Sequence, residues 1–340
     1  MSWLSQDVLL DLGTASTLLV QPGSRYARML PTVAAMRASG ASLRLHSVGE
    51  DAARLEGRTP RGIILSRPVQ GGLVHDVAVA EAFLKHLFHD LPAAAGWQPI
   101  RLLATLPAGA SPAQRRLMEA LGRNAGAREV HLIHPAVATA AGARLDLSDT
   151  HLIADHGAGS TSLSLLHRGQ VIASRQLQGG DSLTHQIGQL LHSEHNLLVG
   201  RAELERVKRL HGFPLSSYLA PQLQVSGVDS TSRRPARRSL ASGAIAGPFM
   251  GHLRLLTEGL RGMLSQVPRE ISGPLARKGV LLTGQGAEAR GLARMLQATL
   301  GAPIVVDHAP QSTALRGLPA AARLTQEAQG DGALVAAAAS

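Results

Sequence analysis

Two stretches of this 340-residue chain decide its fold: Asp11-Leu12-Gly13-Thr14-Ala15-Ser16-Thr17 and Asp155-His156-Gly157-Ala158-Gly159-Ser160-Thr161. Both read D-x-G-x-x-S-T, and short apolar runs flank both copies. The runs are residues 8–10 and 18–20 around the first copy, and 152–154 and 163–166 around the second. Apolar runs on either side of a glycine-containing turn predict a strand–turn–strand hairpin. We therefore expect two related hairpins, one in each half of the chain.

The residue types in these turns suit a phosphate group. Glycine lets the backbone turn sharply and approach a ligand closely, and backbone N–H groups with Ser/Thr hydroxyls can cradle phosphate oxygens. An aspartate at a strand end can hold a hydrated Mg²⁺, so Asp11 and Asp155 are candidate metal ligands. The candidate phosphate-binding residues are Gly13, Thr14, Ala15, Ser16, Gly157, Ala158, Gly159, Ser160 and Thr161.

The repetition separates a functional interpretation from a plain structural one. A single D-x-G-x-x-S-T could be an ordinary polar hairpin turn. Two copies between matching apolar strands favour two related domains that clamp one nucleotide from opposite sides.

A third glycine turn lies near the C-terminal end. Residues 279–282 have the pattern of a buried strand, Gly284-Gln285-Gly286 follows, and residues 288–296 have helical periodicity. A strand, a glycine turn and a helix N-terminus in succession suit a nucleotide, because N–H groups at the helix start point at the ligand. We add Gly284, Gln285 and Gly286 to the candidate binding residues.

Composition narrows the class of protein. Hydrophobic residues make up 44% and charged residues 17%, which is typical of a globular chain. No cysteine is present, so disulfides and thiolate metal sites are excluded and a reducing cytoplasm fits. We find no run of about eighteen apolar residues and no secretory signal at the start. A net charge of +10 attracts anions in general, but 2% aromatic residues argue against the stacking surfaces of nucleic-acid binders.

At these motifs the chain resembles the MreB family within the actin superfamily. The hairpins resemble the family's phosphate-1 and phosphate-2 motifs, and Thr283-Gly284-Gln285-Gly286 resembles its adenosine motif. Gly179-Gly180-Asp181 resembles the family's G-G-D, and Glu205 and Lys208 match an element that contacts the nucleoside in the family. The resemblance therefore adds Gly180, Asp181, Glu205 and Lys208 to the candidate binding residues. It runs in order over nearly the whole chain and includes Gly57-Arg58-Thr59-Pro60 and Gly126-Ala127-Arg128-Glu129-Val130.

The resemblance implies an actin-like α/β fold, with two related domains, a nucleotide cleft between them and four subdomains. Domain I would comprise residues 1–145 and 311–340, with 31–65 as its outer subdomain. Domain II would comprise residues 146–310, with 180–244 as its outer subdomain. ATP with Mg²⁺ would bind in the cleft. The family assembles into membrane-bound double filaments that guide cell-wall synthesis and rod shape.

One departure from the family pattern concerns hydrolysis. Where the family has two glutamates after a Leu-Ile strand, this chain has His134 and Pro135. The second glutamate positions the attacking water, and proline has neither a side-chain acceptor nor an N–H for that task. A shift of one residue would pair His134 with that glutamate instead, and histidine could act as a poor general base. We take His134 and Asp155 as catalytic candidates and predict that ATP hydrolysis is slow or lost.

Three further differences from the family pattern lie in the predicted binding motifs. His156 occupies a position that is apolar in the family, and Gln285 stands in the adenosine turn. Ala158 stands where the family has glycine, which is tolerable if its φ is negative. The pattern suggests a divergent member that keeps nucleotide binding and has relaxed hydrolysis.

The leading functional interpretation is a nucleotide-dependent cytoskeletal protein that forms filaments linked to cell shape or cell-wall synthesis. It would assemble with itself or with a paralogous actin-like protein. A non-filamentous ATP-gated scaffold and a small-molecule kinase of the same superfamily are the alternatives. We expect no specific nucleic-acid partner.

We expect a cytoplasmic protein, with a peripheral position at the inner face of the plasma membrane left open. Trp3-Leu4 or the basic stretch Arg233–Arg238 could contact an anionic membrane surface. For the basic stretch, a solvated loop is the alternative interpretation.

Overall fold

A computed structural model describes residues 6–24, 26–39, 42–89, 91, 99–107, 109–213, 222–267 and 269–338. The chain divides into two compact units. Unit 1 comprises Met1–Asp149, His167–Val171 and Ser312–Ser340, and unit 2 comprises Thr150–Leu166 and Ile172–Gln311. The finer division into four subdomains stays a prediction.

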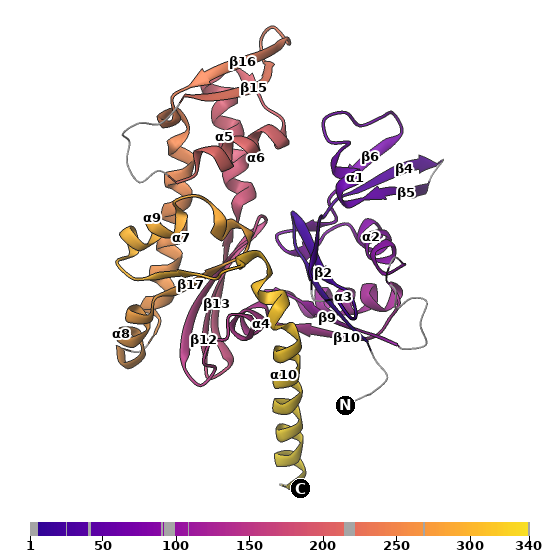
Figure 1. Cartoon of the computed structure of the whole chain (residues 1–340), viewed down its shortest axis with the longest axis vertical. Helices are drawn as coiled ribbons and strands as arrows, with labels where there is room; N and C mark the ends of the chain where they lie inside the picture. The colour runs from indigo at the N-terminus through magenta and orange to yellow at the C-terminus, as the bar shows by residue number, and fades with distance from the viewer. Residues whose placement is uncertain are drawn as a thin grey trace. The chain divides into compact units, whose positions relative to one another are not determined.

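A five-stranded sheet of order β10-β9-β1-β2-β3 forms the centre of unit 1 (Figure 1). Its strands are β1 Gln6–Leu12, β2 Ser16–Val20, β3 Arg28–Pro31, β9 Ile100–Thr105 and β10 Ala127–Ile133. β1 and β10 both run parallel to β9, whereas β2 is antiparallel to both β1 and β3. The carboxyl ends of β1, β9 and β10 therefore lie at one edge of the sheet.

Helices cover both faces of this sheet. Because successive side chains of a strand point to opposite faces, Val8 and Leu10 join a buried cluster with Phe83 of α2 and Leu121 of α3. Leu9 instead joins the cluster formed with α4 and α10. The helices are α2 Val77–His89, α3 Pro112–Asn124, α4 Pro135–Gly142 and α10 Thr313–Ala338.

Helices α4 and α10 approach each other at two glycines. A Cβ at Gly142 would lie 1.9 Å from the Thr313 carbonyl oxygen, and one at Gly317 would lie 1.8 Å from the Ala138 carbonyl oxygen. Neither contact tolerates a side chain. The packing therefore fixes α4 behind the carboxyl end of β10.

Smaller sheets complete unit 1. β4 Ala34–Ser39 lies between β5 Ser42–Val48 and β6 Ile63–Ser66, and both pairings are antiparallel. The short helix α1 Gly49–Ala53 buries Ala52 against this sheet. β7 Val69–Gln70 and β8 Leu73–Val74 form a two-stranded ribbon.

Unit 2 contains a sheet of the same order as unit 1, β18-β17-β11-β12-β13 (Figure 1). Its strands are β11 Thr150–His156, β12 Ser160–His167, β13 Gln170–Gln178, β17 Val280–Thr283 and β18 Ile304–Val306. β11 runs parallel to β17, and β17 runs parallel to β18. β11 thus corresponds to β1 and β12 to β2, so both D-x-G-x-x-S-T stretches form the predicted hairpins.

One continuous hydrophobic cluster joins the sheet of unit 2 to its helices. The helices are α5 Gly180–His195, α6 Arg201–His211, α7 Ala246–Ser265, α8 Arg269–Lys278 and α9 Leu292–Leu300. Three further strands form a small sheet of order β14-β15-β16, namely β14 Leu197–Leu198, β15 Leu223–Asp229 and β16 Pro235–Leu240. Among the described residues, no helix has the length and apolar character needed to span a membrane.

The prediction of a helix from residue 288 is wrong at its start. The glycine turn after β17 continues as the short 3-10 helix η3 Gln285–Glu288, and α9 begins only at Leu292. Gly291 precedes α9 with φ +82°, and a Cβ there would lie 2.0 Å from the Phe213 carbonyl oxygen. This left-handed residue interrupts the helical pattern that the sequence alone suggested.

Candidate nucleotide-binding site

The predicted binding residues occupy turns and helix starts. In unit 1, Gly13, Thr14 and Ala15 form the turn between β1 and β2, and Ser16 opens β2. In unit 2 the turn between β11 and β12 holds Gly157, Ala158 and Gly159, followed by Ser160 and Thr161 in β12. Gly180 and Asp181 open α5, Glu205 and Lys208 lie on α6, and Gly284, Gln285 and Gly286 follow β17.

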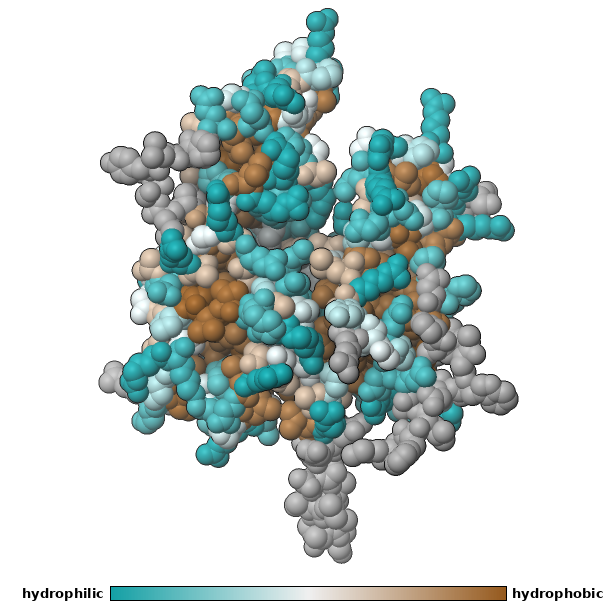
Figure 2. Space-filling model, viewed as in Figure 1, coloured by the Kyte–Doolittle hydropathy of each residue, from teal (hydrophilic) through white to brown (hydrophobic). Residues whose placement is uncertain are grey.

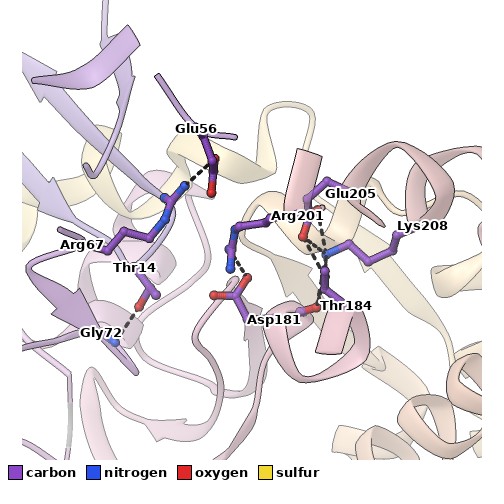
Figure 3. Close-up of polar contacts among 10 residues, drawn as sticks. Thr14, Glu56, Arg67, Gly72, Asp181, Thr184, Arg201, Glu205 and Lys208 are labelled. Atoms are coloured by element: carbon purple, nitrogen blue, oxygen red, sulfur yellow. Dashed lines mark hydrogen bonds and ion pairs between the residues drawn. The ribbon is translucent and has the colours of Figure 1, made fainter. Parts of the chain in front are cut away.

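The first hairpin turn is too tight for a side chain at its glycine. The Gly13 N–H donates to the Ser16 carbonyl oxygen at 3.1 Å, and a Cβ at Gly13 would lie 2.6 Å from that oxygen. Thr14 Oγ1 accepts a hydrogen bond from the Gly72 N–H at 2.9 Å (Figure 3). The segment before β8 therefore holds the Thr14 side chain in one orientation.

Asp11 is held near the carboxyl end of β1 by a neighbouring strand. Thr105 Oγ1, at the end of β9, donates to Asp11 Oδ1 at 2.6 Å. Burial raises the pKa of Asp11, and the hydrogen bond from Thr105 offsets this only in part. A buried carboxylate gains from a bound metal ion, so Asp11 fits the predicted Mg²⁺ role. Sequence reasoning missed Thr105.

The second hairpin packs directly on the start of α5. The Gly180 N–H donates to the Gly157 carbonyl oxygen at 3.0 Å, and the Asp181 N–H donates to the Ala158 carbonyl oxygen at 2.8 Å. A Cβ at Gly179 would lie 2.5 Å from the Ala158 carbonyl oxygen. The paired glycines of the G-G-D motif therefore let the helix begin in contact with the hairpin backbone.

The third glycine turn closes on the same hairpin. A Cβ at Gly284, which has φ +81°, would lie 2.4 Å from Asp155 Oδ1, and one at Gly286 would lie 2.3 Å from His156 Cδ2. A side chain at either position would therefore clash with the hairpin. Unit 2 thus brings Asp155, the hairpin turn and the third turn together, whereas the Gln285 side chain is exposed.

The two substituted positions of this hairpin are accommodated differently. Among the described residues, the non-glycine residues with positive φ are Arg144, Arg168, Asn196 and Arg233. Ala158 is not one of them, so its methyl group meets the condition set above. His156 is 3% exposed, and its Nδ1 lies 2.7 Å from Thr161 Oγ1. Burial, with smaller effects of His252 and Lys208, lowers the pKa of His156 to about 3, so the ring is neutral.

The ammonium group of Lys208 forms three hydrogen bonds within unit 2. Its Nζ donates to the Gly180 carbonyl oxygen at 3.1 Å, to Thr184 Oγ1 at 2.7 Å and to Glu205 Oε1 at 3.0 Å (Figure 3). Thr184 Oγ1 also lies 2.6 Å from Glu205 Oε1 and donates to that carboxylate. An ammonium group has three donors, so Lys208 joins α6 to the start of α5.

Each acidic member of this group has a basic partner. Burial alone would raise the pKa of Glu205, but the Lys208 charge and the hydrogen bonds from Thr184 and Lys208 lower it by more, so the net shift is downward. Asp181 Oδ1 pairs with the guanidinium of Arg201 at 2.8 Å (Figure 3). Thr184 and Arg201 were not identified from the sequence. Thr184 lies one helical turn after Gly180, a spacing that could have identified it.

His134 lies between the end of β10 and the start of α4. Its Nδ1 accepts the N–H of Ala136 at 3.1 Å, which makes the imidazole the N-terminal cap of the helix, and Pro135 occupies the first helical position. Burial lowers the pKa of His134. The ring nitrogen that would abstract a proton as a base is therefore already an acceptor in the cap.

No three His, Asp or Glu side chains within the described ranges come together as a metal-binding group. Asp11 and Asp155 are single carboxylates at equivalent strand ends of the two units. Mg²⁺ is usually held by one or two carboxylates, waters and substrate phosphates rather than by an all-protein cage. Each carboxylate, taken within its own unit, is of the kind that holds a metal ion arriving with a nucleotide.

Sequence comparisons match this chain to a family of known proteins. A family model described as MreB/Mbl protein matches residues 5–329. The cell shape-determining protein MreB of Escherichia coli (strain K12) is 31% identical over 319 residues, which cover 92% of each chain. The cell shape-determining protein Mbl of Bacillus subtilis (strain 168) is 26% identical over 310 residues, which cover 90% of this chain and 92% of the relative.

Solved structures of other proteins have a fold similar to that of this chain. MreB 5 of Spiroplasma citri bound to AMPPNP superposes with a TM-score of 0.87 at 23% identity, covering 96% of this chain and 99% of that one. A MamK double helical filament gives a TM-score of 0.77 at 18% identity, with 95% and 99% coverage. The predicted actin-like α/β fold is confirmed. With the family model matching almost the whole chain, the chain belongs to the MreB/Mbl family.

Proposed function

We propose that this protein is an actin-like cytoskeletal protein that binds a nucleotide, assembles with copies of itself into filaments and serves cell shape. The observation that carries the proposal is the repeated hairpin, which follows the same strand of two sheets of identical order. The names of the relatives from E. coli and B. subtilis, and the filament solved for MamK, support the assembly and the cellular role.

In this proposal the nucleotide is ATP with Mg²⁺. MreB 5 of Spiroplasma citri has been solved with AMPPNP and with ADP, which supports nucleotide binding. Backbone N–H groups and hydroxyls of each hairpin turn would hold phosphate oxygens, and Asp11 and Asp155 would hold the hydrated metal ion. Because all three Lys208 donors are occupied, Lys208 would hold Glu205 and the start of α5 in place rather than neutralise phosphate.

Hydrolysis is slow in this proposal. The Pro135 side chain offers no group that could orient water. The unprotonated nitrogen of His134, Nδ1, which could otherwise act as a base, accepts the hydrogen bond of the helix cap. Filaments would then persist after assembly. Alternatively, the chain would co-assemble with a paralogous actin-like protein that hydrolyses ATP faster.

The small sheet of unit 2 supports a further contact with an anionic membrane surface. Arg233, Arg234 and Arg237 are exposed at and beside the turn of the β15–β16 hairpin, whereas Arg238 is paired with Asp229 at 2.8 Å. The tip of this hairpin is coloured hydrophilic in Figure 2. Exposed arginines attract lipid phosphates. Trp3-Leu4, the other predicted contact, lies outside the described residues.

High-speed sedimentation with Mg²⁺–ATP, with Mg²⁺–ADP and without nucleotide tests the proposed function. We expect pelleting that requires ATP and persists for hours, and its loss in Asp155→Asn. Asp51→Asn, which changes an exposed aspartate paired with Arg54 on the surface, is the matched control and should pellet normally. No pelleting of the unmodified protein in any state would contradict filament formation and favour a monomeric ATP-gated scaffold. ATP turnover at a rate ordinary for the family would contradict slow hydrolysis.

A further inference from the structure

Three polar residues lie in a row at the carboxyl edge of the unit 1 sheet. Asp11 lies near the end of β1, Thr105 ends β9, and His134 directly follows β10. The strand register pairs Thr105 with Ile133, and Thr105 is bonded to Asp11. Two strand spacings, about 10 Å, therefore separate the backbone at Asp11 from that at His134. Ligands of open α/β sheets bind at this edge.

The helix cap decides which nitrogen of His134 carries the proton. Nδ1 accepts the Ala136 N–H, so it must be unprotonated. A neutral imidazole has one N–H, which is then on Nε2. Because burial lowers the pKa of His134, the doubly protonated form is disfavoured as well. The tautomer follows from the hydrogen-bond network.

The Nε2 of His134 is buried and has no hydrogen-bond partner within the described part of the chain. Burying an N–H donor without an acceptor is costly, and buried polar groups are nearly always paired. A water-activating base needs a free lone pair, whereas this nitrogen offers a proton. The acceptor for it is therefore an electron-rich group from outside the chain.

We propose that His134 donates a hydrogen bond from Nε2 to the terminal phosphate of the bound nucleotide, at the first of the two adjacent positions where the family has glutamates. The inference rests on the proposed nucleotide binding. A donor at this place binds the triphosphate more tightly than the diphosphate, since only the triphosphate presents the extra oxyanion. His134 is thus a positioning residue that makes the protein select for ATP.

Equilibrium binding of AMPPNP and ADP, both with Mg²⁺, tests the inference. His134→Ser keeps a good helix cap but removes the imidazole donor. We expect it to weaken AMPPNP binding roughly tenfold or more, as for a hydrogen bond to a charged group, and to change ADP binding less than twofold. His131→Ser is the matched control, because His131 lies on β10 three residues before His134, is 33% exposed and bonds to Glu129. It should leave both affinities unchanged.

Long-range nitrogen–proton spectra of ¹⁵N-histidine-labelled protein give a second readout that needs no variant to bind nucleotide. The His134 signal, assigned by its absence from His134→Ser, should show an unprotonated Nδ1 and a protonated Nε2. The Nε2 resonance should move with AMPPNP and stay in place with ADP. A purely structural cap would show no such difference.

An AMPPNP-to-ADP affinity ratio that is equal in the unmodified protein and in His134→Ser overturns the inference, as would be found if a buried water alone satisfied Nε2. A protonated Nδ1 also overturns it. If the unmodified protein binds neither nucleotide, the proposed nucleotide binding itself fails. The two failures are therefore distinguishable.

Discussion

Gly286 lies against the imidazole of His156 so closely that a Cβ at residue 286 would be 2.3 Å from His156 Cδ2 and 2.7 Å from the His156 carbonyl oxygen. The turn after β17 and the hairpin after β11 therefore depend on each other. His156 is itself fixed through Thr161, at 2.7 Å. A change in the third glycine turn must displace the hairpin that begins with Asp155.

Gly286→Ala should destabilise the protein by about 1–3 kcal/mol, the usual cost of overpacking a tight contact. The measurement is urea unfolding followed by circular dichroism. Gly251→Ala is the control, because Gly251 lies within α7 with nothing within 4 Å of its Cβ position, and alanine there should stabilise the helix slightly. His156→Ala should recover part of the loss in the Gly286→Ala background. Purely additive effects would show that the two residues are not coupled.

Acid should unfold the protein through the buried His252. This residue is 3% exposed, and the centre of its ring lies 5.1 Å from that of His156. Its Nε2 has no hydrogen-bond partner among the described residues. Burial, and to a smaller extent the Lys208 charge, lowers the pKa of His252 to about 4. The unfolded chain binds this proton near pH 6.5, and the folded chain does not until about pH 4. Stability should therefore fall as pH drops through this window, by at most about 1.4 kcal/mol per pH unit.

His252→Phe should reduce the loss of unfolding free energy between pH 6.5 and pH 4 to the part that comes from the remaining titrating groups, chiefly the buried His156, whose pKa is about 3. Phenylalanine keeps the packing against Phe213 but cannot titrate. Thermal melting across this range measures the effect. His308→Phe replaces an imidazole that is 78% exposed and should retain the full acid sensitivity. An unchanged pH dependence in His252→Phe would assign the acid loss to other groups.

The hairpins were predictable from sequence because their signal is local. Apolar runs bracket a glycine turn, and a Cβ at Gly13 would clash within its own hairpin. The third turn was predictable as a turn. The reason for Gly284 and Gly286 was not, because these glycines pack against Asp155 and His156, which are distant in the sequence. The start of α9 was missed for the same reason, since Gly291 packs on the distant Phe213.

The candidate binding residues have a local sequence signal, whereas the residues that contact them depend on the folded structure. Glu205 and Lys208 match a motif of the family. Their hydrogen bonds to Thr184 and Gly180, however, depend on how α6 packs on α5, and this packing cannot be predicted from the sequence pattern. The partner of Asp11, Thr105, comes from a strand that is adjacent only in the folded sheet. Sequence therefore predicted the candidate binding groups and missed the residues that hold them in place.

Thr184→Val should weaken both stability and nucleotide binding. The change keeps the side-chain shape but removes the hydroxyl that bonds to Lys208 and Glu205, at a cost of about 1 kcal/mol for partly exposed partners. Thr257→Val is the matched control, because the buried Thr257 hydroxyl donates within its own helix, to the Leu253 carbonyl oxygen. Unfolding and AMPPNP titrations measure both effects. Equal nucleotide affinity in the two variants would show that the Thr184 bridge is purely structural.

Replacing Arg233, Arg234 and Arg237 by alanine should reduce binding to phosphatidylglycerol vesicles, measured by co-sedimentation. Each arginine near an anionic surface contributes about 1 kcal/mol, so the three together should change partitioning roughly a hundredfold at low salt. The loss should shrink as salt screens the surface, and binding to neutral phosphatidylcholine should be weak in all variants. The control removes the same charge from exposed positions of α3 in unit 1, Arg115, Arg116 and Arg123. If both triple variants lose the same affinity, net charge rather than the β15–β16 hairpin drives the contact.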